Sequence, residues 1–267
     1  MKKVLIKITV TIISLYVLLC IALFFLQEKM IFFPEKLDRN YSFQFNQNFK
    51  EMTIPVDKSV SLNGILFKAD SSKGLIFYLH GNAGSLRTWG EVAKAYTNLS
   101  YDVFIMDYRG FGKSGGNISS QQQLFKDIQI VYDTLHRSYN DSNIIVLGYS
   151  IGSGLAAKLA SENHPKKLIL QAPYYSLTDM MEHTYPYVPT ILLKYKFETY
   201  NYLQSCKMPV IIYHGNNDEV IYYGSSLKLK KLFKQSDTLI TIEGQEHNGI
   251  TRNKEYLKSI EKVLLSN

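Results

Sequence analysis

The sequence has 267 residues, of which 46% are hydrophobic and 20% are charged, and its formal net charge is +7 at pH 7. This length suits one large α/β domain or at most two small ones, and the hydrophobic share excludes a disordered chain. The lysines are dispersed and no nucleic-acid-binding motif accompanies them, so we expect no nucleic-acid partner. The two cysteines, Cys20 and Cys206, stand far apart and no Cys/His cluster has zinc spacing, so we expect neither an intramolecular disulfide nor a metal site.

An uncharged run near the N-terminus, residues 8–26, is preceded by three lysines. As a helix it is long enough to cross a hydrocarbon core of about 30 Å. A cleaved signal peptide usually has a shorter apolar core and a small-residue cleavage site, and residues 23–27 offer no such site. We therefore expect residues 1–29 to be an uncleaved signal anchor, with cleavage as the alternative. The positive-inside rule favours a cytoplasmic N-terminus, which places residues 30–267 on the periplasmic or extracellular side.

Beyond the anchor, short apolar runs alternate with helical patterns. Continuous apolar runs are typical of strands buried on both faces, and their alternation with helices predicts a mostly parallel sheet. The predicted strands are 52–56, 64–67, 75–79, 103–106, 144–147, 168–170, 210–213 and 239–242. The predicted helices are 86–99, 121–136, 152–162, 224–233 and 253–265.

One interval breaks this alternation. About forty residues separate the predicted strands 168–170 and 210–213, and they include seven tyrosines together with Pro186 and Pro189. A connection of this length inside a compact domain usually has a function. We predict that residues 171–208 form a small helical lid over the carboxyl edge of the sheet.

The sequence G-Y-S-I-G, residues 148–152, directly follows the predicted strand 144–147 and precedes a helix of small residues. A serine at such a strand-to-helix turn is held in a strained, exposed position that suits nucleophilic attack. Gly148 and Gly152 let the backbone pass close to its neighbours in this tight turn. We predict that Ser150 is a catalytic nucleophile.

Two further polar residues follow predicted strands at the same edge of the sheet. Asp218 comes after strand 210–213 and His247 after strand 239–242. Open parallel sheets form their sites beyond the carboxyl ends of the strands, so we expect both residues to meet Ser150. Imidazole takes the serine proton near neutral pH, and a carboxylate on the other ring nitrogen fixes the imidazole tautomer. The sequence therefore predicts Ser150, Asp218 and His247 as nucleophile, acid and base, in the chain order known for strand–turn–helix hydrolases.

The tetrahedral intermediate of acyl transfer also requires backbone N–H donors for its negatively charged oxygen. The amide of Ile151 is one candidate, because this residue follows the nucleophile and begins a helix. The amide of Asn82 is the other, in the H-G-N-A-G loop after strand 75–79. We expect these two amides to form the oxyanion hole.

Several other polar residues also lie at or near strand ends and are either alternative catalytic candidates or structural residues. Glu219 and, more distantly, Asp179 are alternative candidates for the acid. His80 and His214 end strands just before a glycine, and we expect them to brace loops by hydrogen bonds. Asp107 is conceivable as a second catalytic carboxylate, but we expect it to order the loop beside the oxyanion hole.

From residue 32 to the C-terminus the chain resembles the α/β-hydrolase superfamily, and within it the small membrane-anchored bud-emergence-like and serine-aminopeptidase-like hydrolases. The resemblance implies an eight-stranded sheet, a catalytic triad of Ser150, Asp218 and His247, and hydrolysis of an ester, thioester or amide. The lid differs most among such relatives, so the resemblance does not identify a substrate. It rests on the motifs M-I-F-F-P (30–34), H-G-N-A-G (80–84), D-Y-R-G-F-G-K-S-G (107–115), G-Y-S-I-G (148–152), H-G-N-N-D-E-V-I (214–221) and E-H-N (246–248).

These observations together predict a membrane-anchored, monomeric serine hydrolase that needs no cofactor and acts on lipid-like or acylated molecules, through ester or thioester cleavage. A serine peptidase that removes N-terminal residues from short peptides is an alternative, with Asp179 or Glu182 pairing with the free amine. An alternative of another class is a non-catalytic, membrane-tethered binding module, because a fold by itself never proves an activity.

Overall fold

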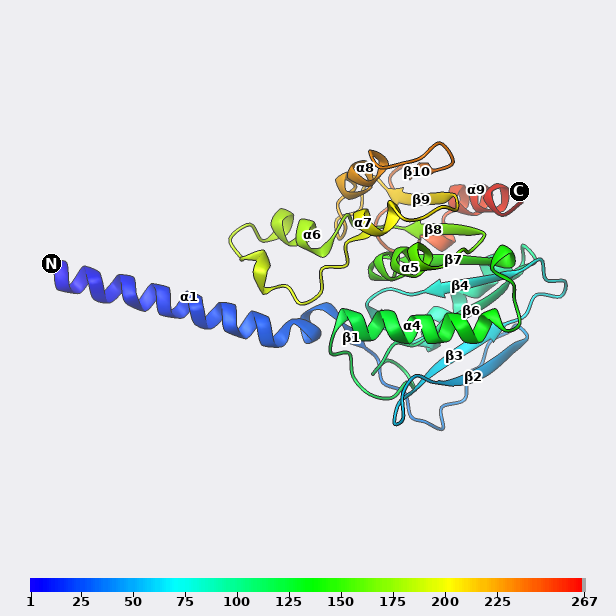
Figure 1. Ribbon diagram of the computed structural model, residues 1–267, viewed down its shortest axis with the longest axis horizontal. Helices are drawn as coiled ribbons and strands as arrows, with labels where there is room; N and C mark the ends of the chain where they lie inside the picture. The colour runs from blue at the N-terminus through cyan, green and yellow to red at the C-terminus, as the bar shows by residue number, and fades with distance from the viewer. Residues whose placement is uncertain (266–267) are drawn as a thin grey trace.

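A mixed eight-stranded sheet organises the protein, of which the computed structural model describes residues 1–265 (Figure 1). Its strand order is β10-β9-β8-β7-β4-β6-β3-β2, and all neighbouring strands are parallel except the pairs β2–β3 and β3–β6. The mostly parallel, eight-stranded sheet predicted from the sequence is thus confirmed. The strands are β2 (Phe49–Pro55), β3 (Ser61–Phe67), β4 (Leu75–Leu79), β6 (Asp102–Met106), β7 (Ile144–Tyr149), β8 (Lys167–Gln171), β9 (Val210–Gly215) and β10 (Thr238–Ile242).

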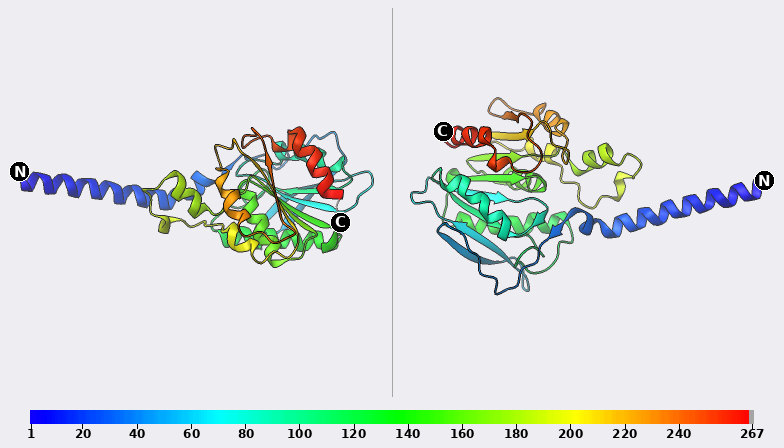
Figure 2. Two further views of the ribbon diagram at one scale, coloured as in Figure 1. Left: turned by 90° about the horizontal axis from the view of Figure 1, so that it is seen from above. Right: turned by 180° about the vertical axis from the view of Figure 1, so that it is seen from behind.

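Helices cover both faces of this sheet (Figure 2). Alternate side chains of a strand point to opposite faces, so in β4 Phe77 packs into a core with α4, α5 and α8, while Ile76 packs into a second core with α2, α3 and α9. This two-sided burial explains the continuous apolar runs of the central strands. The helices are α2 (Leu86–Trp89), α3 (Lys94–Thr97), α4 (Gln121–His136), α5 (Ile151–Glu162), α6 (Leu177–Thr184), α7 (Thr199–Leu203), α8 (Gly224–Lys230) and α9 (Lys254–Leu265), with 3₁₀ turns at Gly90–Ala93, Asp141–Asn143, Thr190–Leu192 and Ile250–Arg252.

The prediction of one continuous helix over residues 86–99 is wrong, because α2 and α3 are separated by a 3₁₀ turn that begins at Gly90. The ring of Phe45 lies directly against this glycine, and a Cβ at position 90 would lie 2.3 Å from the Phe45 ring. The long-range contact of Phe45 therefore occupies space that a side chain at position 90 would need.

The connection between β8 and β9, predicted as the lid, contains α6, the Thr190–Leu192 turn and α7. Its two halves differ. Residues around α6 and the turn project from the domain toward the N-terminal helix (Figure 1), whereas Tyr195 and Phe197 are fully buried in the core beneath α7. The projecting part of the connection is therefore smaller than the predicted range of residues 171–208.

The N-terminal helix α1 (Lys2–Ile31) extends from the domain as a nearly straight rod (Figure 2). Its most apolar window has a mean hydropathy of 2.7 and contains no buried residue, so the helix is long and apolar enough to cross a membrane. The chain then enters a short parallel pairing between β1 (Phe33–Pro34) and β5 (Ala83–Gly84), which joins the connector to the loop after β4.

The closest approach of a helix to the sheet gives a first prediction. A Cβ at Gly152 of α5 would lie 2.1 Å from the carbonyl oxygen of Leu79 in β4, so α5 must move outward to admit one. We expect Gly152→Ala to lower the free energy of unfolding by about 3 kcal/mol through overpacking, measured by chemical denaturation in detergent.

The control for this substitution is Gly115→Ala, where the nearest atom to the new Cβ is 3.6 Å away. We expect this change to stay within about 0.5 kcal/mol. Equal stability of the two variants would show that α5 and β4 separate without cost, against the prediction.

Candidate active site

Ser150 occupies the sharp turn between β7 and α5, with φ 54° and ψ −122°. A residue with a side chain rarely adopts this conformation, and it persists where surrounding contacts enforce it. Here the Ser150 amide donates to the carbonyl of Gln171 at 2.9 Å, and its own carbonyl accepts the hydroxyl of Ser153 at 2.6 Å. The turn predicted from the G-x-S-x-G spacing is therefore present.

The two glycines around this turn are required by space. A Cβ at Gly148 would lie 2.4 Å from the carbonyl oxygen of Gly152, and one at Gly152 would meet the backbone of β4. Any side chain at either position would force the turn open. The sequence spacing thus reflects direct packing of the turn on itself and on β4.

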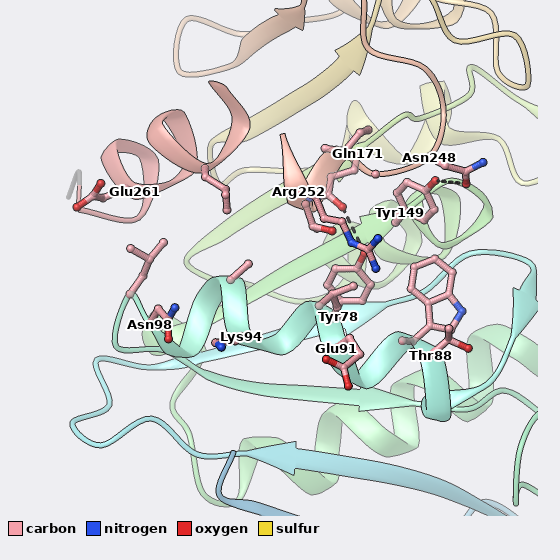
Figure 3. A pocket seen from close by; sticks show the side chains of 18 of the residues that line it. Tyr78, Thr88, Glu91, Lys94, Asn98, Tyr149, Gln171, Asn248, Arg252 and Glu261 are labelled. Atoms are coloured by element: carbon pink, nitrogen blue, oxygen red, sulfur yellow. Dashed lines mark hydrogen bonds between the residues drawn. The ribbon is translucent and has the colours of Figure 1, made fainter. Parts of the chain in front are cut away.

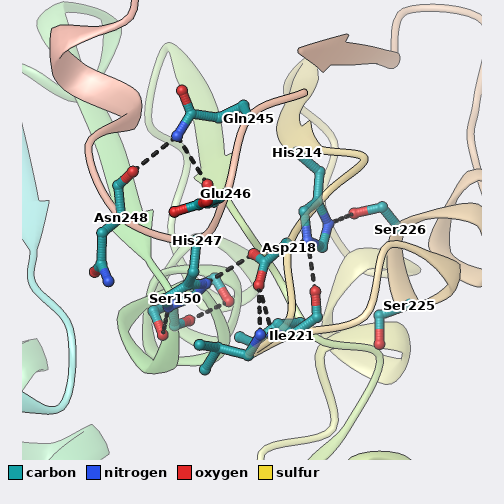
Figure 4. A network of polar contacts seen from close by, with 12 residues as sticks. Ser150, His214, Asp218, Ile221, Ser225, Ser226, Gln245, Glu246, His247 and Asn248 are labelled. Atoms are coloured by element: carbon teal, nitrogen blue, oxygen red, sulfur yellow. Dashed lines mark hydrogen bonds and ion pairs between the residues drawn. The ribbon is translucent and has the colours of Figure 1, made fainter. Parts of the chain in front are cut away.

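The structure brings the three predicted side chains into one hydrogen-bonded chain (Figure 4). Ser150 Oγ lies 3.0 Å from His247 Nε2, and His247 Nδ1 lies 2.7 Å from Asp218 Oδ2. All three residues are at least 90% buried. With Nδ1–H donating to the carboxylate, Nε2 of His247 is left as an acceptor for the serine hydroxyl.

The Asp218 carboxylate is held by contacts on both oxygens. Oδ1 accepts the amides of Val220 and Ile221 at 2.9 and 2.8 Å, and Oδ2 faces both His247 and His214. Burial by itself would raise the pKa of Asp218, but the hydrogen bonds from the two histidines and the Ile221 amide hold it well below its usual range. This carboxylate is therefore ionised throughout the neutral pH range.

The alternative acid candidates are placed differently. Glu219 is exposed beside the buried Asp218. Asp179 of α6 bonds the hydroxyl of Tyr222 and the ammonium group of Lys228. Of the three carboxylates, Asp218 is the one in contact with His247.

The predicted bracing role of His214 is confirmed. Its Nε2 donates to the carbonyl of Ile221 at 2.9 Å, and its Nδ1 lies 2.6 Å from Ser226 Oγ. His214 thereby ties the turn that carries Asp218 to the start of α8.

Tyr149 is a residue whose role the sequence did not reveal. Its hydroxyl donates to the carbonyl of His247 at 2.9 Å, and its ring lies 5.3 Å from the imidazole. Tyr149 therefore fixes the loop that carries His247 directly beside Ser150. In the sequence, only its position next to Ser150 could have indicated this role, because the contact with His247 joins residues 98 positions apart.

The loop predicted to supply an oxyanion donor is pinned to the connector after α1. Asn82 Nδ2 donates to the carbonyl of Ile31 at 2.8 Å, and the amide of Phe33 donates to the carbonyl of Asn82 at 2.8 Å. The other predicted donor, Ile151, is the first residue of α5, where amides have no acceptor within the helix.

Asp107 and His80 order the same loop. Asp107 Oδ1 accepts the amide of Leu86 at 2.9 Å, which confirms the structural role predicted for it. His80 Nδ1 donates to the carbonyl of Gly81 at 2.6 Å, and Tyr108 binds the carbonyl of His80. Burial raises the pKa of Asp107 well above its usual range, whereas burial lowers the pKa of His80 to about 4. His80 is therefore neutral inside the folded protein near pH 5.

A cavity of about 930 Å³ lies between the sheet and the helices α2, α3 and α9 (Figure 3). Tyr149 and Asn248 line it, next to Ser150 and His247 in the chain. Neither Ser150 nor His247 lines this cavity. Within residues 1–265, no cluster of three or more His, Cys, Asp or Glu side chains could hold a metal ion.

Comparison with known proteins identifies the family to which the chain belongs. Residues 70–203 match the model of a family described as serine aminopeptidase, S33. The protein bem46 of Schizosaccharomyces pombe is 30% identical over 190 residues, which cover 67% of this chain and 63% of that protein. The human α/β hydrolase domain-containing protein 17C is 28% identical over 202 residues, covering 73% of this chain and 59% of that protein. The chain therefore spans about three fifths of the length of these two relatives.

Solved structures share the fold. The Pyrococcus furiosus esterase Pf2001 superposes with a TM-score of 0.69 at 20% identity, covering 88% of this chain and 96% of that one. Est1E from Butyrivibrio proteoclasticus superposes with a TM-score of 0.64 at 17% identity, covering 80% and 97%. At these identities the likeness establishes the α/β-hydrolase fold.

The buried His80 gives a prediction about acid stability. Its folded pKa of about 4 lies below the ordinary value of 6.5, so the unfolded chain binds a proton at pH 5 that the folded protein does not. Stability from this group is therefore lost as the pH falls below 6.5. We expect the contribution of His80 to the free energy of unfolding to fall by about 2 kcal/mol between pH 7 and pH 5. Denaturant titration measures it as the difference between the unmodified protein and His80→Gln, because the buried Asp107, whose pKa is raised, acts in the opposite sense.

The variant His80→Gln should show a smaller loss over the same interval, because it removes the titrating group. His164→Gln, on an exposed residue, should retain the loss of the unmodified protein. Identical pH dependence of the two variants would contradict the assignment to His80.

Proposed function

This chain belongs to the serine aminopeptidase (S33) family of α/β hydrolases, and on that premise we propose that it is a serine hydrolase that cleaves ester or thioester bonds through an acyl-enzyme. One observation carries the proposal: the hydrogen-bonded chain from Ser150 Oγ through His247 to Asp218, built on a strained turn. This arrangement is the one that activates a serine hydroxyl on other folds as well.

In the proposed reaction Ser150 Oγ attacks the carbonyl carbon of the substrate while His247 Nε2 takes the hydroxyl proton. The ionised Asp218 holds the Nδ1–H tautomer and stabilises the imidazolium that forms. His247 then gives the proton to the leaving alkoxide or thiolate. A water molecule, deprotonated by the same imidazole, releases the acid and restores Ser150.

The amides of Ile151 and Asn82 are proposed to hold the oxyanion of the tetrahedral intermediate. Support for Ile151 is its place at the first turn of α5, directly after the nucleophile. Support for Asn82 is the way its loop is held on both sides, by the connector after α1 and by Asp107.

The substrate class is proposed from location. Helix α1 is apolar enough to span a membrane, and the lysines before it favour a position of the following domain outside the cytoplasm. A hydrolase fixed at a bilayer meets lipid-like esters and acylated molecules at high local concentration. We therefore favour long acyl substrates over freely diffusing polar ones.

The family description favours a second candidate, an aminopeptidase acting on short peptides. That activity needs an acidic group to bind the free α-amine. The carboxylate of Asp179 is engaged by Lys228 and Tyr222, whereas Glu182 is exposed on α6. Esters, thioesters and aminoacyl amides of graded acyl length, offered to the same preparation, separate the two candidates. Hydrolysis of short soluble esters without any long-chain substrate would overturn the lipid-like preference.

The first test of the proposal is the nucleophile. We expect Ser150→Ala to lower the hydrolysis rate by at least about 10³-fold and to abolish covalent labelling by a fluorophosphonate probe. Ser161→Ala, a serine on α5 whose hydroxyl bonds the helix backbone, should label normally. An unmodified protein that neither labels nor hydrolyses any acyl substrate would favour a binding module instead.

The second test is the acid. Asp218→Asn keeps the shape of the side chain but removes the charge that fixes the His247 tautomer, so we expect kcat to fall by about 10⁴-fold. Glu219→Gln makes the same chemical change at the exposed neighbour and should leave kcat within about twofold, since surface changes of this kind have small effects. A similar kcat in the two variants would remove Asp218 from the mechanism.

A further inference from the structure

Residues 185–193, here called the lid tip, form an exposed apolar segment between α6 and the buried Tyr195. The lid tip carries no charged residue. The exposed fractions of Tyr185, Tyr187 and Ile191 are 63%, 88% and 88%. Contiguous exposed apolar surface of this kind marks an interaction site, and the contacts of the lid tip indicate its partner.

The lid tip is bonded along the side of α1 (Figure 1). The hydroxyl of Tyr16 donates to the carbonyl of Tyr187 at 2.8 Å. One end of the segment is held by Gln27, whose amide donates to the carbonyl of Leu192 at 2.6 Å and accepts the amide of Lys194 at 2.9 Å. These contacts fix the position of the lid tip along the helix axis.

That position has a geometric consequence. The uncharged run 8–26 of α1 is about 28 Å long at 1.5 Å per residue, close to the thickness of a hydrocarbon core. Tyr16 lies at the middle of this run. If residues 8–26 span the bilayer, the carbonyl of Tyr187 bonded to Tyr16 must lie within the hydrocarbon as well.

Irregular backbone enters hydrocarbon only where its polar groups are satisfied. Residues 186 and 189 are prolines and have no N–H group. Four of the seven N–H groups of this segment have acceptors: Tyr185 to Met181, Val188 to Tyr185, Leu192 to Pro189 and Leu193 to Thr190. Two of its carbonyls are capped by side chains of α1. These bonds lower the cost of placing the segment in an apolar solvent.

A polar boundary closes the segment. Glu28 lies 3.3 Å from the Lys194 ammonium group and accepts the hydroxyl of Tyr195 at 3.1 Å. The same ammonium group lies 4.7 Å from the centre of the Phe24 ring. Paired charges beside aromatic rings are typical of the level where a membrane protein meets the headgroups.

We propose that the lid tip is inserted, together with the half of α1 next to the domain, into the adjacent leaflet of the bilayer, where it contacts lipid acyl chains. Anchor and lid then form one membrane-inserted unit. The insertion does not depend on the proposed hydrolytic activity.

The test places one environment-sensitive fluorophore at a time in the full-length protein, reconstituted into phosphatidylcholine vesicles. The probe is attached by maleimide to Cys20 on α1, or to Tyr187→Cys or Ser71→Cys in a Cys20→Ser background. Burial raises the pKa of the Cys206 thiol to about 12, so this buried residue does not compete for label. Ser71 is exposed before β4, at the amino edge of the parallel strands and opposite the lid.

With insertion, the probes at positions 20 and 187 both emit at shorter wavelength than the probe at position 71. They are quenched more by mid-chain spin-labelled lipid than by iodide. The proposal is overturned if the probe at position 187 has the emission wavelength and quenching of the probe at position 71, while the probe at position 20 is quenched by the spin-labelled lipid. If the probe at position 20 is quenched more by iodide than by the spin-labelled lipid, both the membrane span of α1 and the insertion of the lid tip are overturned. A probe at 187 shielded from both quenchers reports a protein contact and also overturns it. Unchanged thermal unfolding of the labelled variants shows that each is folded.

Discussion

The close approach of α5 to β4 at Gly152 is the constraint on which the site depends. It leaves no room for a side chain above the carbonyl of Leu79, and the same packing leaves none at Gly148. The chain between these glycines must turn sharply, and Ser150 takes a conformation that ordinary residues avoid. A helix that begins immediately after the serine then follows from the same geometry. The strain at Ser150 is offset by two large cores on either side of the sheet, which hold β7 and α5 in register.

Helix α1 is bonded to the loop that carries Asn82 at the candidate site. The residues that follow α1 pair with the loop after β4, and Asn82 of that loop bonds the last residue of α1. On the other side, Gln27 and Tyr16 of α1 hold the lid. Helix α1 therefore contacts both the loop that carries Asn82 and the lid tip, so it is joined to the domain by more than the covalent connection alone.

Much of this architecture could be predicted from the sequence, because it rests on local signals. Buried strands read as apolar runs, and the residues after their carboxyl ends, Ser150, Asp218 and His247, meet because parallel strands end at one edge. What escaped prediction depends on contacts between distant positions. Phe45 packs against Gly90, where the helix gives way to a 3₁₀ turn, and Gln27 bonds to Leu192 of the lid across 165 residues. No local propensity encodes either pairing.

The tyrosines of the lid also show that residue type alone does not predict burial, although the sequence does contain one indication of which tyrosines are exposed. Tyr195 is fully buried, whereas Tyr187 is almost fully exposed, although both lie in one aromatic-rich segment. Residue type does not distinguish the buried tyrosine from the exposed one, but the distribution of charged residues around them does. Residues 185–193 carry none, and lysines resume at Lys194, where the chain returns to the domain. This apolar stretch is too short to span a bilayer and is flanked by charge. It lies beside a helix that is long enough to span one, and that contact is what suggests a role for it. The contacts with helix α1 are thus what give this exposed apolar loop an interpretation beyond imperfect packing.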